Sequence, residues 1–154
     1  MGPRLRAIQG RQCPRVKNVA SAKVQILQAG LACCGVEAAA VDLVAQLERS
    51  EIDVFDVADA TTTQPANILV VAGTVTKALA PKVLAAYESL ATPKVVVAYG
   101  VCAITGGPYW DSYSVLQGAA ELIPVNINVP GCPPSPTDLA AAISQAQKLV
   151  AQNA

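Results

Sequence analysis

The arrangement of short apolar runs constrains the fold of this chain more than any other feature of its sequence. Four runs are nearly continuous and rich in β-branched residues, at residues 23–28 (KVQILQ), 67–72 (NILVVA), 94–99 (KVVVAY) and 121–126 (ELIPVN). Such runs are typical of parallel strands that are covered on both faces of a sheet. Pro124 indicates an edge position for the last run, and a weaker alternating run at residues 52–57 indicates another edge strand.

Helical patterns occupy the segments between these runs, at about residues 36–49, 76–90 and 136–152. The last pattern follows Ser135 and begins at Pro136, because serine caps a helix well and proline fits the first helical position. Strands that alternate with helices predict an α/β fold. We therefore expect a single doubly wound, flavodoxin-like sheet that is mostly parallel and has helices on both faces.

Charge divides the chain into an expected basic N-terminal arm at residues 1–22 and an α/β domain at residues 23–154. Residues 1–23 hold six basic residues and no acid, whereas the rest holds five basic residues and all eleven acids. A basic arm can contact an anionic membrane surface or an acidic partner. Nucleic acid is not an expected partner, because the arm has no aromatic side chain to stack on bases.

The composition is too apolar for an average lone domain. Hydrophobic residues make up 53% of the chain and charged residues 14%, against about 25% charged in typical domains. This balance excludes intrinsic disorder. No run reaches the roughly 20 apolar residues of a membrane span, and the N-terminus lacks the apolar stretch of a signal peptide. We therefore expect a chain without a transmembrane segment, in a reducing compartment, whose surplus apolar surface meets other subunits.

The cysteines carry the chemistry, because the absence of histidine removes Ser–His and Cys–His catalysis and histidine-ligated metals. Cys33 and Cys34 follow the first expected strand, Cys102 follows the third and Cys132 follows the fourth. Because the carboxyl ends of parallel strands meet at one edge of a sheet, these four thiols are expected together. Cys13 lies outside the pattern and is expected to be a free or interface thiol.

Four thiols at one place suit an iron–sulfur cluster or a tetrahedral zinc ion. The cluster is favoured, because structural zinc usually takes ligands from C-x2–4-C pairs and the chain has none. Other readings are four cysteines buried as small apolar residues and a non-redox α/β binding module with a structural metal. Flavin binding at the strand ends is a further alternative, for which residues 73–77 (GTVTK) form only a weak phosphate loop.

Four segments together resemble one known family. They are residues 30–37 (GLACCGVE), 71–76 (VAGTVT), 106–115 (GGPYWDSYSV) and 129–136 (VPGCPPSP). The family is the small iron–sulfur subunit, of the 20 kDa type, that respiratory complex I shares with membrane-bound NiFe hydrogenases and formate hydrogenlyases. The resemblance runs from about residue 23 to residue 150.

This resemblance implies one 4Fe–4S cluster ligated by Cys33, Cys34, Cys102 and Cys132. It implies an electron-transfer subunit of a complex I-like oxidoreductase, peripheral on the cytoplasmic side of a membrane, that passes electrons to or from a site at the large subunit. The implied partners are a large catalytic-type subunit, a ferredoxin-like iron–sulfur subunit and a membrane subunit, with quinone as acceptor in the complex I branch. Glu37 matches an acidic position of the family.

A few residues bear on whether the chain is similar to the complex I members or to the hydrogenase members of this family. The adjacent pair Cys33–Cys34 is similar to the complex I branch, because hydrogenase members more often space these ligands as C-x-x-C. The chain departs from the quinone-reducing pattern at residues 38–40, where alanines replace methionines, and at residues 56–66, which carry no arginine. The small subunit of a NiFe hydrogenase or formate hydrogenlyase complex is therefore the alternative within this family.

Overall fold

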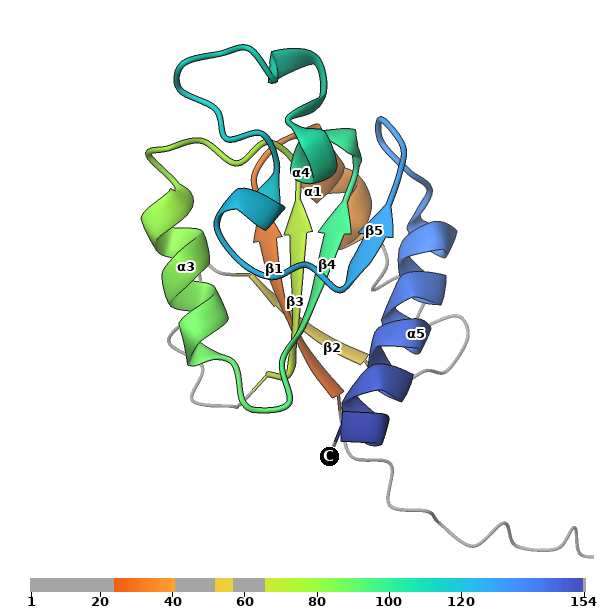
Figure 1. Cartoon of the computed structure of the whole chain (residues 1–154). Helices are drawn as coiled ribbons and strands as arrows, with labels where there is room; N and C mark the ends of the chain where they lie inside the picture. The colour runs from red at the N-terminus through yellow and green to blue at the C-terminus, as the bar shows by residue number, and fades with distance from the viewer. Residues whose placement is uncertain (1–23, 41–51, 57–65, 154) are drawn as a thin grey trace, which may run out of the picture.

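The structure, a computed structural model, describes residues 24–40, 52–56 and 66–153, of which residues 24–27 and 52–56 are described by their backbone (Figure 1). The expected basic arm and Cys13 lie outside the described residues. So do most of the predicted helix beyond residue 40 and most of the segment at residues 56–66.

Five parallel strands form one sheet in the order β2-β1-β3-β4-β5. In chain order they are β1 (Val24–Gly30), β2 (Ile52–Asp56), β3 (Ile68–Ala72), β4 (Val95–Tyr99) and β5 (Ile127–Val129). The strand order reverses between β1 and β3, which is the flavodoxin-like arrangement. The predicted doubly wound α/β fold is confirmed, and every described strand pair is parallel.

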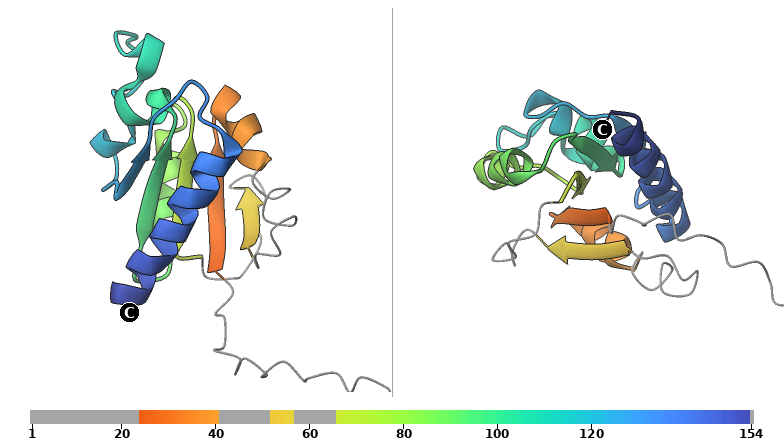
Figure 2. Two further views of the ribbon diagram at one scale, coloured as in Figure 1. Left: turned by 90° about the vertical axis from the view of Figure 1, so that its right-hand side faces the viewer. Right: turned by 90° about the horizontal axis from the view of Figure 1, so that it is seen from below.

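Helices cover both faces of this sheet (Figures 1 and 2). The described helices are α1 (Cys33–Ala39), α3 (Ala80–Ser89), α4 (Val101–Thr105) and α5 (Pro136–Asn153), with short 3-10 turns at Gly107–Tyr109 and Ala119–Glu121. Side chains of α1 and α5 pack on one face, and side chains of α3 and α4 pack on the other. No helix within the described ranges combines the length and apolarity that crossing a membrane requires.

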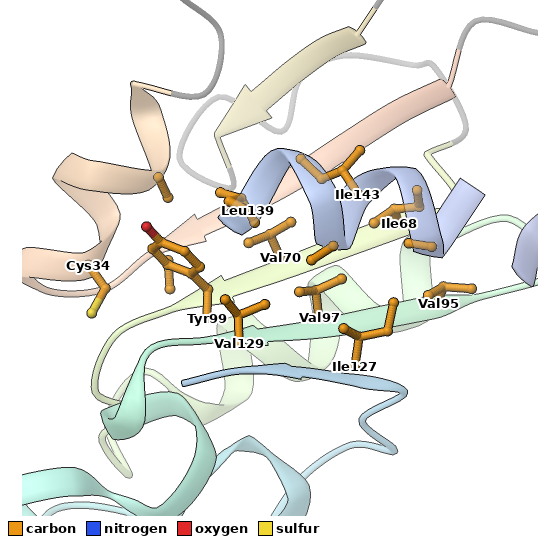
Figure 3. Close-up of a cluster of buried hydrophobic side chains, with 14 residues drawn as sticks. Cys34, Ile68, Val70, Val95, Val97, Tyr99, Ile127, Val129, Leu139 and Ile143 are labelled. Atoms are coloured by element: carbon orange, nitrogen blue, oxygen red, sulfur yellow. The ribbon is translucent and has the colours of Figure 1, made fainter. Parts of the chain in front are cut away.

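The central strands β3 and β4 are buried on both faces, which explains their continuous apolar sequences. Alternate residues pack against opposite layers: Ile68 and Val70 lie in the core beside α5, whereas Leu69 lies in the core beside α3. Figure 3 shows the first of these cores, with Leu139 and Ile143 of α5 lying over the sheet.

The predicted strand at residues 121–126 is wrong. This segment begins with the last residue of a 3-10 turn (Ala119–Glu121), and the strand β5 begins at Ile127 instead. Pro124 has no N–H for a strand ladder and lies before the strand. Asn126 marks the boundary, because its side-chain Oδ1 accepts a hydrogen bond from the backbone N–H of Val96 at 2.8 Å. An edge strand is therefore present, but later in the chain than predicted.

The helices predicted at residues 76–90 and 136–152 are confirmed with shifted ends, whereas most of the helix predicted at residues 36–49 lies outside the described residues. Helix α5 begins at Pro136 as expected: the N–H of Asp138 donates to Ser135 Oγ, and the N–H of Ser135 donates to Asp138 Oδ2, both at 3.2 Å. This reciprocal pair caps the helix. Helix α3 begins four residues later than predicted, because Thr76 pairs with Val115 in an isolated bridge.

The chain that follows β1 lies against the end of β3. The N–H of Leu31 donates to the carbonyl oxygen of Ala72 at 2.9 Å. At the next position Gly73 has φ +115°, and a Cβ there would lie 2.7 Å from the backbone nitrogen of Ala32. Glycine is thus needed for both its dihedral angle and its lack of a side chain. This close approach lets helix α1 start beside the ends of β3 and β4.

Replacing Gly73 with alanine should therefore destabilise the fold. We expect Gly73→Ala to lower the free energy of unfolding by more than about 2 kcal/mol, through the strained φ and the clash with Ala32. Gly30→Ala is the matched control, because a Cβ at Gly30 would meet its nearest heavy atom at an ordinary 3.5 Å. Urea unfolding measures both, and an equal loss in the two variants would contradict this account of the crossing.

Candidate metal centre

The four predicted ligands lie at the carboxyl edge of the sheet, uppermost in Figure 1. Cys33 and Cys34 are the first two residues of α1, Cys102 is the second residue of α4, and Cys132 lies in the turn after β5. The sequence predicted all four in turns, and this holds for Cys132 alone. Cys34 and Cys102 are buried, whereas Cys33 and Cys132 are exposed.

The Cys34 thiol lies close enough to the other three thiols for their charges to act on it. The pKa of Cys34 is raised from 9.0 to about 11, chiefly by burial and then by the neighbouring thiols of Cys33, Cys102 and Cys132. A hydrogen bond with the Cys33 side chain acts in the same direction. Four free thiolates would repel one another here, so this site favours thiolates only together with positive charge.

Glycines keep the space beside the buried thiols free. Gly100 has φ +92°, and a Cβ there would lie 2.5 Å from the Sγ of Cys34. Gly107 has φ +56°, and its Cβ would lie 2.8 Å from the Sγ of Cys102. These two positions leave backbone rather than side chains beside sulfur, which suits a bulky inorganic group.

Among the described residues, no group of three or more histidine, cysteine, aspartate or glutamate side chains is arranged to hold one metal ion. A four-iron cube needs a wider arrangement, because each thiolate binds a different iron. The donor set of four cysteine sulfurs and the glycine-lined space fit such a group.

Backbone hydrogen bonds join the segments that carry Cys102 and Cys132. The N–H of Gly100 donates to the carbonyl oxygen of Val129, and the N–H of Val101 donates to that of Gly131, both at 2.8 Å. The turn after β5 is therefore fixed against the start of α4.

Two positioning side chains were missed in the sequence. Gln28 is buried and its Nε2 donates to the carbonyl oxygen of Gly35 at 3.2 Å, which joins β1 to α1. Tyr99 is buried and its hydroxyl donates to the carbonyl oxygen of Pro134. A polar side chain near the end of an apolar run is the signal that could have identified both. Glu37 lies half-buried on α1, one turn after Cys33.

Two solved structures with a similar fold belong to redox complexes. A chain of the membrane-bound sulfane sulfur reductase, an archaeal respiratory membrane complex, aligns with a TM-score of 0.69 at 27% identity, over 83% of this chain and 71% of that one. A chain of an NAD+-reducing NiFe-hydrogenase aligns with a TM-score of 0.58 at 25% identity, over 79% of this chain and 89% of that one.

Sequence comparison identifies the family. The sequence model described as "NADH ubiquinone oxidoreductase, 20 Kd subunit" matches residues 31–146, and the chain belongs to this family. The resemblance stated from the four motifs is thereby confirmed.

Curated relatives are likewise named as subunits of NADH-quinone oxidoreductase. The relative from Streptomyces griseus subsp. griseus is 42% identical over 123 residues, which are 80% of this chain and 51% of the relative. The relative from Salinispora tropica is 41% identical over 122 residues, 79% of this chain and 63% of the relative. The chain thus spans between about half and two thirds of the length of these relatives.

The raised pKa values predict that the metal-free chain loses stability at alkaline pH. In the folded chain the pKa of Cys34 is raised from 9.0 to about 11, and the pKa of Tyr99 is raised from 10.0 to about 12. The unfolded chain releases these protons first, so the stabilisation is complete below pH 9 and is lost as pH rises through 11 and 12. Urea midpoints measured between about pH 7 and 11 should fall steeply above about pH 9.

Cys34→Ala should flatten this decline between pH 9 and 11, because it removes one of the two described groups whose pKa folding raises. A decline as steep as in the wild type would show that other groups control the alkaline loss.

Proposed function

We propose that the chain binds one 4Fe–4S cluster through Cys33, Cys34, Cys102 and Cys132. The observation that carries this proposal is the gathering of these thiols from three segments at one sheet edge, with glycines beside the two buried sulfurs. Membership of the family implies an iron–sulfur cluster, which supports the proposal independently of the geometry.

We infer that the chain is an electron-transfer subunit of a complex I-like oxidoreductase, at the cytoplasmic face of a membrane. The bound cluster would supply one-electron chemistry. The chain's own residues hold it: the four thiolates bind, the backbone at Gly100 and Gly107 approaches sulfur, and burial around Cys34 and Cys102 excludes water. The chain has no histidine for proton transfer.

The large catalytic-type subunit is proposed to dock at the carboxyl edge of the sheet. All the exposed large hydrophobic side chains of the described residues lie on α1 or on the segment after α4: Val36, Tyr109, Trp110 and Tyr113. Figure 1 shows the segment after α4 projecting beyond this edge. The exposed thiols of Cys33 and Cys132 open on the same edge, so a subunit that covers it lies next to the cluster. A ferredoxin-like subunit and a membrane subunit are proposed as further partners.

Quinone is the proposed acceptor, supported by relatives at 41–42% identity that are named NADH-quinone oxidoreductase subunits. A hydrogenase-type complex is the second candidate, supported by the NiFe-hydrogenase likeness and by Ala38–Ala40 on and beside α1, where the quinone-reducing pattern has methionines. The large subunit distinguishes them. Paired C-x-x-C motifs at both of its ends would favour hydrogenase, and their loss would favour quinone.

Iron analysis and EPR of the complex, purified anaerobically with its genomic neighbours, test the cluster. We expect about four irons per copy of this chain beyond those that the partner subunits hold, and an S = 1/2 signal of its own after dithionite reduction. Cys102→Ser should abolish that signal, because it removes a buried ligand. Cys13→Ser is the matched control and should retain both iron and signal. Zinc, or no metal, in the intact wild-type complex would overturn the proposal.

Substitution of Trp110 tests the docking edge. Trp110→Glu introduces a charge into the exposed aromatic group and should lower co-purification of the large subunit at least about tenfold. Gln145→Glu adds the same charge on the exposed side of α5 and should leave co-purification within about twofold. An equal loss in both variants, or no loss in either, would assign the interface to another surface.

A further inference from the structure

A side-chain hydrogen bond joins the end of β4 to the segment that follows Cys132. The hydroxyl of Tyr99 donates to the carbonyl oxygen of Pro134 at 2.5 Å, between residues 35 positions apart in the chain. Both residues are buried. Loss of this bond would therefore leave the carbonyl oxygen of Pro134 without its Tyr99 hydrogen bond in an environment that excludes water, which is unfavourable. Pro134 lies two residues after Cys132 and directly before Ser135, which caps α5.

The two sides of the Cys132 turn are held by different means. On the N-terminal side, the N–H groups of Gly100 and Val101 donate to the carbonyl oxygens of Val129 and Gly131. These bonds are made by backbone atoms alone. On the C-terminal side, the hydroxyl of Tyr99 holds the carbonyl oxygen of Pro134. This hydrogen bond depends on one side-chain atom.

The Tyr99 ring also lies beside another proposed ligand. It packs in the core that contains Cys34, Val129 and Leu139, and Figure 3 shows it next to Cys34. Burial, followed by the charges of Cys34, Glu37 and Asp138, raises the pKa of Tyr99 to about 12. The hydroxyl therefore keeps its proton and remains a hydrogen-bond donor throughout the neutral range.

We propose that Tyr99 is a positioning residue of the metal centre. Its hydroxyl holds Pro134 and thereby fixes the direction from which the Cys132 thiol approaches the thiols of α1 and α4. The role in cluster geometry rests on the proposed function, whereas the anchoring of the turn stands on the hydrogen bond itself.

Tyr99→Phe tests this role, because it removes the hydroxyl and keeps the ring in the core. Asn67→Ala is the matched control. It removes partly buried hydrogen bonds from Asn67 Nδ2 to the carbonyl oxygens of Ala91 (3.0 Å) and Pro93 (3.3 Å) at the opposite edge of the sheet. Two measurements on the purified complex are compared: EPR of the dithionite-reduced sample, and amide hydrogen exchange after the iron is removed with a chelator.

In Tyr99→Phe we expect exchange to be about five- to tenfold faster at Val101 and Ser135, whose N–H groups bond to Gly131 and Asp138 around the Cys132 turn. The EPR g-values should shift as well. In Asn67→Ala both should match the wild type. Unchanged exchange in Tyr99→Phe, or acceleration spread over the whole sheet, would overturn the anchoring.

The two proposals can fail separately. Faster exchange with unchanged g-values would overturn the role in cluster geometry while the anchoring stands. A wild-type complex without an iron–sulfur signal would overturn the proposed function, and the exchange data would still decide whether Tyr99 fixes the turn.

Discussion

The close contact between the β1–α1 connection and the end of β3 is the constraint on which the rest of the site depends. In a parallel sheet with this strand order, β3 separates β1 from β4, so thiols following β1 and β4 would stand apart. Because Gly73 lets the backbone of Ala32 lie directly against it, α1 begins beside Gly100, and Cys34 comes within reach of the segments that carry Cys102 and Cys132. One residue without a side chain thus allows three segments to meet.

The sequence predicted the elements that have a repeating apolar pattern, and it missed those that depend on a single hydrogen bond. The buried strands at residues 68–72 and 95–99 were predictable, because both faces of each are covered and the apolar pattern is continuous. The short strand β5 was misplaced, because residues 121–126 are equally apolar and only the pairing of Asn126 with Val96 shows where the ladder begins. The cysteines were found through their position after strands, whereas for Gln28 and Tyr99 the sequence shows only a polar group near the end of an apolar run and does not show which carbonyl oxygen each one binds.

The surroundings of Cys34 disfavour the thiolate form that a metal ligand must adopt. Burial and mutual repulsion keep the Cys34 proton in place in the metal-free chain, whereas metal ligation requires the thiolate. The energy of binding must therefore cover deprotonation as well as ordering of the site, which couples metal loading to folding. Of the proposed ligands, the buried thiols of Cys34 and Cys102 would carry most of that coupling, since the exposed thiols remain solvated without metal.

The brevity of β5 has a consequence for how this apolar chain meets other proteins. An exposed edge strand offers a row of unpaired N–H and C=O groups, which invites another strand to add to the sheet. Here the edge is three residues long, and its middle residue, Asn128, points a polar side chain outward between buried Ile127 and Val129. So short an edge gives an incoming strand little to pair with. Recognition on this side must then come through side chains presented by loops, and fibrillar growth from this edge is disfavoured.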